Sequence, residues 1–103
     1  MGVYYSKTLL LIRNYHNVTL KDFSGLTGIA ISTLSFLENG DRNPLVSHLQ
    51  CYADTLSIRL STLIQIAEHI QEGYEITVST PHEKKVVDTI LDINRLKNQI
   101  KKH

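Results

Sequence analysis

Two short amphipathic segments meet at Gly28, and this junction constrains the fold of the chain more than any other feature. Thr19 is a typical N-cap for the first segment, and a glycine such as Gly28 commonly ends a helix in the left-handed conformation. The second segment is predicted over residues 30–39, with Leu34 and Leu37 toward the core. Because so few residues separate the two helices, their axes must cross steeply.

The first of these two helices is expected to bury Phe23 and Leu26, and the small residues Ser24 and Gly25 lie where it approaches its neighbour. A steep crossing of this kind is the geometry of a helix-turn-helix, in which the second helix presents its outer face to the DNA major groove. The pattern therefore indicates a nucleic-acid-binding element at the centre of the chain.

Further helices are predicted on both sides of this pair. Apolar residues at spacings of four and three predict a helix that ends near Tyr15, and Asn43 followed by Pro44 is typical of a helix start. A fifth helix is expected to end at Gly73. The connections are short, so neighbouring helices must pack together as a bundle over residues 1–72.

Residues 73–103 carry a different pattern. The alternation of apolar and polar residues over 74–79 predicts a β-strand, and Thr80-Pro81 with Glu83 predicts the capped start of a last helix. A single strand needs a partner strand to pair with, and the apolar side of the last helix must be buried. Either a second copy or the chain's own bundle can supply these contacts. We expect a dimerisation surface made by Tyr74, Ile76, Val78, Val86, Ile90, Ile93, Leu96 and Ile100.

Composition argues against several classes of protein. The one cysteine, Cys51, excludes an internal disulfide and fits a reducing, cytoplasmic compartment. The longest aliphatic run, residues 9–12, is far shorter than the roughly 20 residues of a membrane span. No two histidines have the spacing of a zinc helix, and no nucleophile elbow or glycine-rich phosphate loop occurs. We expect no metal, no cofactor, no catalytic residue and no membrane partner.

The charge balance gives weak support for nucleic acid. The chain has 11 basic and 10 acidic residues, a net charge of +1. Residues 1–72 hold five basic and six acidic residues, whereas residues 73–103 hold six and four. A strong electrostatic signal for DNA would be a clearly basic domain or stripe. The totals do not provide one.

Several short motifs occur together between residues 5 and 72. They are Ile12-Arg13, Val18-Thr19, Gly28-Ile29, Ser32-Thr33-Leu34-Ser35, Leu37-Glu38-Asn39-Gly40 with Arg42 and Pro44, and the stretch from Ala53 to Leu63. With these motifs the sequence resembles the lambda repressor and Cro type of helix-turn-helix regulators, the XRE family. The resemblance implies a five-helix domain whose third helix enters the major groove, and a dimer that reads two half-sites roughly 34 Å apart. It also implies that Arg13 and Glu38 pair within the domain.

We therefore predict a mainly α fold, with a five-helix lambda-repressor-like DNA-binding domain over residues 1–72. A short β-strand and a C-terminal dimerisation helix are expected over residues 73–103. The implied function is a sequence-specific transcriptional regulator, a repressor, that binds double-stranded DNA as a homodimer. The expected base-reading residues are Ile31, Ser32, Ser35 and Phe36. The expected phosphate contacts are Thr19, Lys21, Thr27, Arg42 and Asn43.

Two departures from the family pattern keep a second function open. Leu20 and Ala30 stand where family members commonly carry a glutamine and a serine. The outer face of the third helix also lacks the forked donors that pair with guanine or adenine. It could read thymine methyl groups by apolar contact. Equally, exposed Ile31 and Phe36 could bind another regulatory protein, which would make the chain an adaptor or an antagonist.

Overall fold

Six α-helices make up all the regular secondary structure in the computed structural model, which describes the backbone of residues 4–101 and the side chains of residues 4–96. The mainly α class is confirmed. The helices are α1 (Ser6–Tyr15), α2 (Leu20–Thr27), α3 (Ile31–Asn39), α4 (Val46–Thr55), α5 (Leu60–Glu72) and α6 (Pro81–Lys101). None of them is long and apolar enough to cross a membrane, in the part of the chain that is described.

The strand expected over residues 74–79 is absent, and residues 4–101 contain no strand at all. This prediction was wrong. The alternation has a different cause, because Ile76 and Val78 pack against the core while Tyr74 remains exposed. An extended segment becomes a strand only when a second strand completes its backbone hydrogen bonds. Here the side chains of neighbouring helices supply those bonds instead.

Hydrogen bonds to side chains hold the segment between α5 and α6 in place. The Thr77 amide donates to Gln65 Oε1 at 2.8 Å, and the Ser79 amide donates to Glu83 Oε1 at 3.2 Å. The Thr77 carbonyl accepts from Arg59 Nη2 at 3.2 Å. Gln65 and Glu83 belong to α5 and α6. The segment is therefore an extended strap that side chains of the same chain tie down.

The start of α4 also differs from the sequence prediction. Leu45 occupies the N-cap position and Val46 is the first helical residue, so Asn43 is not the cap. The Leu45 amide donates to His48 Nδ1 at 3.0 Å. This bond from the first helical turn back to Leu45 fixes the start of α4 two residues later than Asn43. Asn43 is left exposed in the loop before α4.

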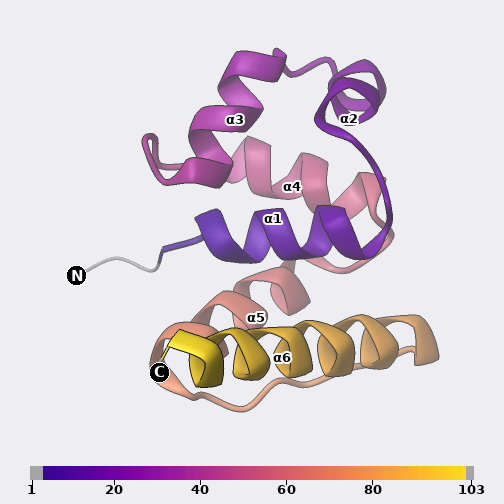
Figure 1. Ribbon diagram of the computed structural model, residues 1–103. Coiled ribbons are helices and arrows are strands. Elements are labelled where there is room, and N and C mark those ends of the chain that lie inside the picture. Colours follow the sequence, from indigo (N-terminus) through magenta and orange to yellow (C-terminus); the bar gives the residue numbers. More distant parts are fainter. Residues whose placement is uncertain (1–3, 102–103) are drawn as a thin grey trace.

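The helices are stacked so that α2 and α3 lie at one end of the molecule and α6 lies at the other (Figure 1). Helix α1 lies between them and contacts both α3 and α6. Val86 and Ile90 of α6 are fully buried in the same core cluster as Leu9 and Ile12 of α1. The two predicted segments, 1–72 and 73–103, therefore share one hydrophobic core.

This packing changes the interpretation of the expected dimerisation surface. The chain's own bundle covers Val86 and Ile90, and Ile93 is partly buried against the same cluster. Tyr74 and Leu96 remain exposed by 62% and 58%. The side chain of Ile100 lies outside the described residues. Only part of the predicted stripe is thus available to a second copy.

The beginning of α6 is anchored by the buried carboxylate of Glu83. The Glu83 amide donates to Thr80 Oγ1 at 3.1 Å, which confirms the predicted cap. Its carboxylate accepts from the Arg59 amide at 2.9 Å and pairs with Arg59 Nη2 at 3.1 Å. Burial alone would raise the pKa of this carboxyl, but the hydrogen bonds from Arg59 and Ser79 outweigh burial and lower it to about 2. Glu83 therefore links the starts of α5 and α6.

We predict that this link weakens in acid. A carboxyl whose pKa is lower in the folded than in the unfolded chain stabilises the fold fully above the unfolded pKa, here about 4.5. The contribution fades as the pH falls from there toward 2. In urea unfolding, Glu83→Gln should lower the free energy of unfolding at pH 7, and the gap to wild type should close toward pH 2. The exposed Glu75→Gln is the control, and a gap that does not change with pH would contradict the prediction.

Candidate nucleic-acid interface

A buried ion pair fixes α3 against α1. Arg13 Nη2 lies 2.7 Å from Glu38 Oε1, and Arg13 Nε donates to Glu38 Oε2 at 2.9 Å. Both side chains are almost fully buried, with 9% and 3% of their surface exposed. Tyr52 of α4 donates its hydroxyl to Glu38 Oε2 at 2.6 Å. The predicted pairing of Arg13 with Glu38 is confirmed, and Tyr52 extends it to a third helix.

The same arginine also orients the loop that leads into α2. Arg13 Nη1 donates to the Val18 carbonyl at 2.7 Å, one residue before the N-cap Thr19. The hydrogen bond to Glu38 raises the pKa of Arg13, so its charge is maintained. Burial, together with the hydrogen bond to Glu38, raises the pKa of Tyr52 as well, so its hydroxyl remains a donor. One network thus positions both helices of the helix-turn-helix.

The turn between α2 and α3 is built by local hydrogen bonds. Gly28 takes the left-handed conformation at φ 78°, and its amide donates to the Ser24 carbonyl at 2.8 Å. Ser24 Oγ donates to the Ile29 carbonyl at 2.6 Å. A Cβ on Gly25 would meet no heavy atom within 4 Å, so the crossing does not require glycine there. Leu26 is 66% exposed, contrary to the burial expected for it, because α2 meets the core through Phe23, which is fully buried, and Leu20, which is partly buried.

The outer face of α3 is open to solvent. Ile31, Ser32 and Phe36 are exposed and Ser35 is half-buried, whereas Leu34 and Leu37 are fully buried on the opposite side. Helix α6 lies at the far end of the molecule and does not cover this face (Figure 1). The structure therefore places all four predicted base-reading residues together on a surface that a groove could receive.

One residue of this face did not emerge as a site from the sequence. Asn39 is exposed at the end of α3, and its Nδ2 lies 3.4 Å from Ser35 Oγ. Its position three residues after Phe36 and four after Ser35 is the signal that could have identified it. The apolar surface also continues beyond α3, since Leu45 and Val46 at the start of α4 are 63% and 71% exposed.

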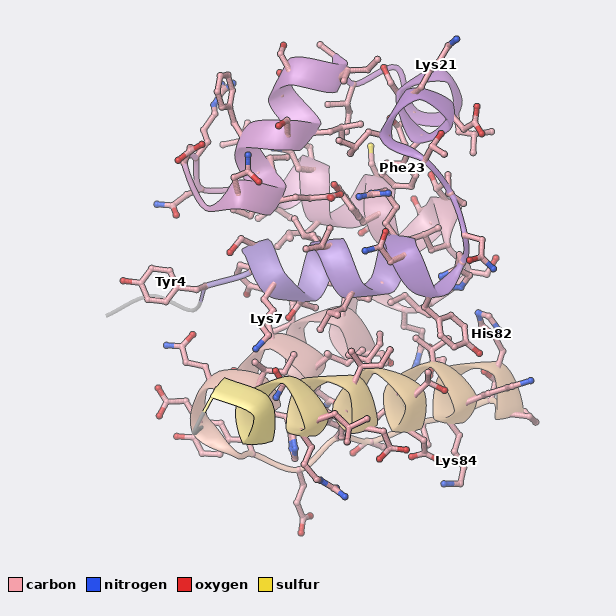
Figure 2. All side chains as sticks on the ribbon, viewed as in Figure 1. Tyr4, Lys7, Lys21, Phe23, His82 and Lys84 are labelled. Atoms are coloured by element: carbon pink, nitrogen blue, oxygen red, sulfur yellow. The ribbon has the colours of Figure 1, made fainter. Side chains whose placement is uncertain are left out.

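The predicted phosphate contacts fall into two groups. Thr19 Oγ1 accepts from the Asp22 amide at 3.1 Å as the N-cap of α2, and this bond does not use the hydroxyl proton. Lys21 points outward from the same helix start (Figure 2). Arg42 is exposed in the loop after α3. These side chains, with exposed Asn43, can donate to an anionic backbone.

Thr27 belongs to the other group. Its hydroxyl donates to the Phe23 carbonyl at 2.8 Å and accepts from the Ile29 amide at 3.2 Å. Phosphate oxygens only accept hydrogen bonds, and the one hydroxyl proton of Thr27 is already used. Thr27 therefore stabilises the turn and is not placed to contact a phosphate.

A short helix, a left-handed glycine turn and a second helix with a free outer face together define a helix-turn-helix domain. The sequence model of the helix-turn-helix family matches residues 9–63, more than half of the chain. The chain thus belongs to this family of DNA-binding regulators, in its lambda repressor and Cro branch. No curated protein and no solved structure gives a significant match to the chain.

The buried network leads to a prediction about stability. Glu38→Gln keeps the size of the side chain but leaves the Arg13 charge unpaired in the interior, which should cost about 3–5 kcal/mol of the free energy of unfolding. The exposed pair of Lys84 and Asp88, 2.9 Å apart, is the control, and Asp88→Asn should cost no more than about 0.5 kcal/mol. Urea unfolding measures both variants. Equal losses for the two would refute the role given to the network.

Proposed function

We propose that the chain is a sequence-specific transcriptional regulator that inserts α3 into the DNA major groove. The observation that carries this proposal is the free outer face of α3, held by the Arg13–Glu38 pair at the end of the molecule opposite α6. The role is binding rather than catalysis. It is exerted in the cytoplasm, where a regulator of this kind meets its DNA.

The chemistry of the face favours operators rich in A·T pairs. Ile31 and Phe36, each 47% exposed, are suited to contact the C5-methyl group of thymine. Ser32 and Ser35 can bond to base edges, and the amide of Asn39 can pair with adenine N6 and N7. Helix α3 carries no arginine or lysine, the side chains that most often recognise guanine.

Few charges support this recognition, which favours a dimer. Lys21 and Arg42 are the only lysine or arginine residues between positions 14 and 58, and the acidic Asp22 and Asp41 lie next to them in the sequence. A homodimer would double a weak contact by presenting two copies of α3 to two half-sites. We propose that the second copy packs against the end of the molecule where Tyr74 and Leu96 remain exposed. Repression requires only that such a dimer occupy a site needed by the transcription machinery.

We predict that DNA affinity falls with salt by the slope expected for released counterions. If Lys21 and Arg42 each neutralise one phosphate, the logarithm of the binding constant should fall with the logarithm of salt concentration with a slope of about −2 per protomer, or about −4 for a dimer. Fluorescence anisotropy with a selected operator would measure this slope. Lys21→Gln should reduce it by about one per protomer, whereas Lys85→Gln, on α6, should leave it unchanged. Affinity that is indifferent to salt would argue against phosphate contact.

We also predict that negative charge on α3 abolishes binding. The double substitution Ser32→Glu and Ser35→Glu places two carboxylates against the DNA, and mobility-shift assays should show at least a 100-fold loss of affinity. Ser61→Glu, on the exposed surface of α5, is the control and should bind normally. Circular dichroism verifies that each variant is folded. Unchanged affinity in the folded double variant would rule out α3 as the reading helix.

A second function is favoured by one observation. Among the described residues, five of the eight large hydrophobic side chains that are strongly exposed lie between positions 26 and 46: Leu26, Ile31, Phe36, Leu45 and Val46. A surface this apolar also suits contact with another regulatory protein, as an adaptor or antagonist. If the chain shifts no DNA fragment, and Phe36→Ser abolishes capture of one defined regulator, the adaptor function replaces the first.

A further inference from the structure

Two histidines from distant parts of the chain face each other where α1 ends and α6 begins. His16 is the C-cap residue of α1, and His82 is the second residue of α6. Their Nε2 atoms are 3.3 Å apart, and their ring centres are 5.3 Å apart with the planes inclined at 55°. The pair lies at the surface, where His82 projects near the end of α1 (Figure 2).

The spacing matches that of two imidazoles that share one tetrahedral metal ion. With Zn–N bonds of about 2.0–2.1 Å, two bound nitrogens lie about 3.3–3.4 Å apart and the ring centres about 5.2 Å apart. The observed distances of 3.3 and 5.3 Å therefore fit a shared ion without movement of either ring.

His16 is already oriented as a metal ligand. Its Nδ1 lies 2.8 Å from the Ile12 carbonyl, which only accepts, so the proton resides on Nδ1 and the lone pair of Nε2 points toward His82. Histidines that bind metals usually donate their second ring N–H to a carbonyl or carboxylate in this way. His82 Nε2 lies 3.4 Å from the Leu56 carbonyl, which also only accepts, so without metal the proton of His82 resides on Nε2. Binding of an ion would displace this proton, and the Nε2 lone pair would become the second ligand.

We propose that His16 and His82 bind one divalent transition-metal ion of the zinc type, which joins the start of α6 to the end of α1. Imidazole nitrogens suit Zn²⁺, Co²⁺, Ni²⁺ and Cu²⁺ rather than Mg²⁺ or Ca²⁺. The described residues contain no group of three or more potential metal ligands, so water or an added ligand completes the tetrahedron. The site does not involve α3, and the proposal is independent of DNA binding.

Such a site would attach α6 more tightly to the rest of the chain. His82 Nε2 also lies 3.4 Å from the carbonyl of Leu56, the C-cap residue of α4, so the ion would sit where three helices meet. An ion bound only by the folded chain stabilises it by mass action. The site therefore couples the stability of the α6 attachment to the concentration of free metal.

The test is a titration of the full chain with Zn²⁺, followed by calorimetry. Wild type should bind one ion, and the unfolding midpoint should rise by on the order of 10 °C at a 100-fold excess over the dissociation constant. His16→Gln and His82→Gln should each bind about 100-fold more weakly, because one imidazole loses the advantage of chelation. Mg²⁺ should have no effect.

His69→Gln is the matched control. His69 also has its Nδ1 near a carbonyl, that of Tyr74 at 2.7 Å, but it belongs to a different part of the surface and should not affect binding. Because a substitution can alter folding, the imidazole resonances of wild type are followed by NMR during the titration. Selective shifts of His16 and His82 support the proposal. Absence of binding, equal loss in His69→Gln, or shifts spread over all histidines would overturn it.

Discussion

A single buried carboxylate, that of Glu38, determines where α3 lies. It accepts hydrogen bonds from Arg13 of α1 and Tyr52 of α4 while it belongs itself to α3. Because an unpaired charge in the interior is costly, the three helices can adopt only arrangements that keep the network complete. Arg13 then extends this control to the Val18 carbonyl and so to the start of α2. The exposed face of α3 can therefore vary in sequence without loss of its position.

Much of this architecture is predictable because short-range chemistry dictates it. Gly28, Gly40 and Gly73 all take the left-handed conformation at the ends of helices, where the sequence predicts them. The pairing of Arg13 with Glu38 followed from the family resemblance. The predictions that were wrong depended on contacts between residues distant in the sequence. The alternation at Ile76 and Val78 resembles a strand, but only the fold reveals that helix side chains replace the partner strand.

The proposed DNA-binding surface also combines features that the sequence predicts with features that it does not. Helical periodicity was enough to group the four predicted reading residues on one side of α3. It could not show that the proton of the Thr27 hydroxyl is already used within the turn. Nor could it show that Leu45 rather than Asn43 precedes α4, since the bond from the Leu45 amide to His48 depends on the rotamer of an imidazole. Hydrogen-bond competition within a loop leaves no periodic signal in the sequence.

The opposite placement of α3 and α6 has a mechanical consequence. The molecule measures 35 × 33 × 28 Å, and these two helices lie at opposite ends of it (Figure 1). If a second copy were bound at α6, α3 would lie at the end of each protomer that is far from the contact. A rotation of one protomer at the α6 contact would then displace its α3 more than it displaces the residues at the contact. The stiffness of the α6 attachment, more than its chemistry, would determine how accurately the two copies of α3 are spaced.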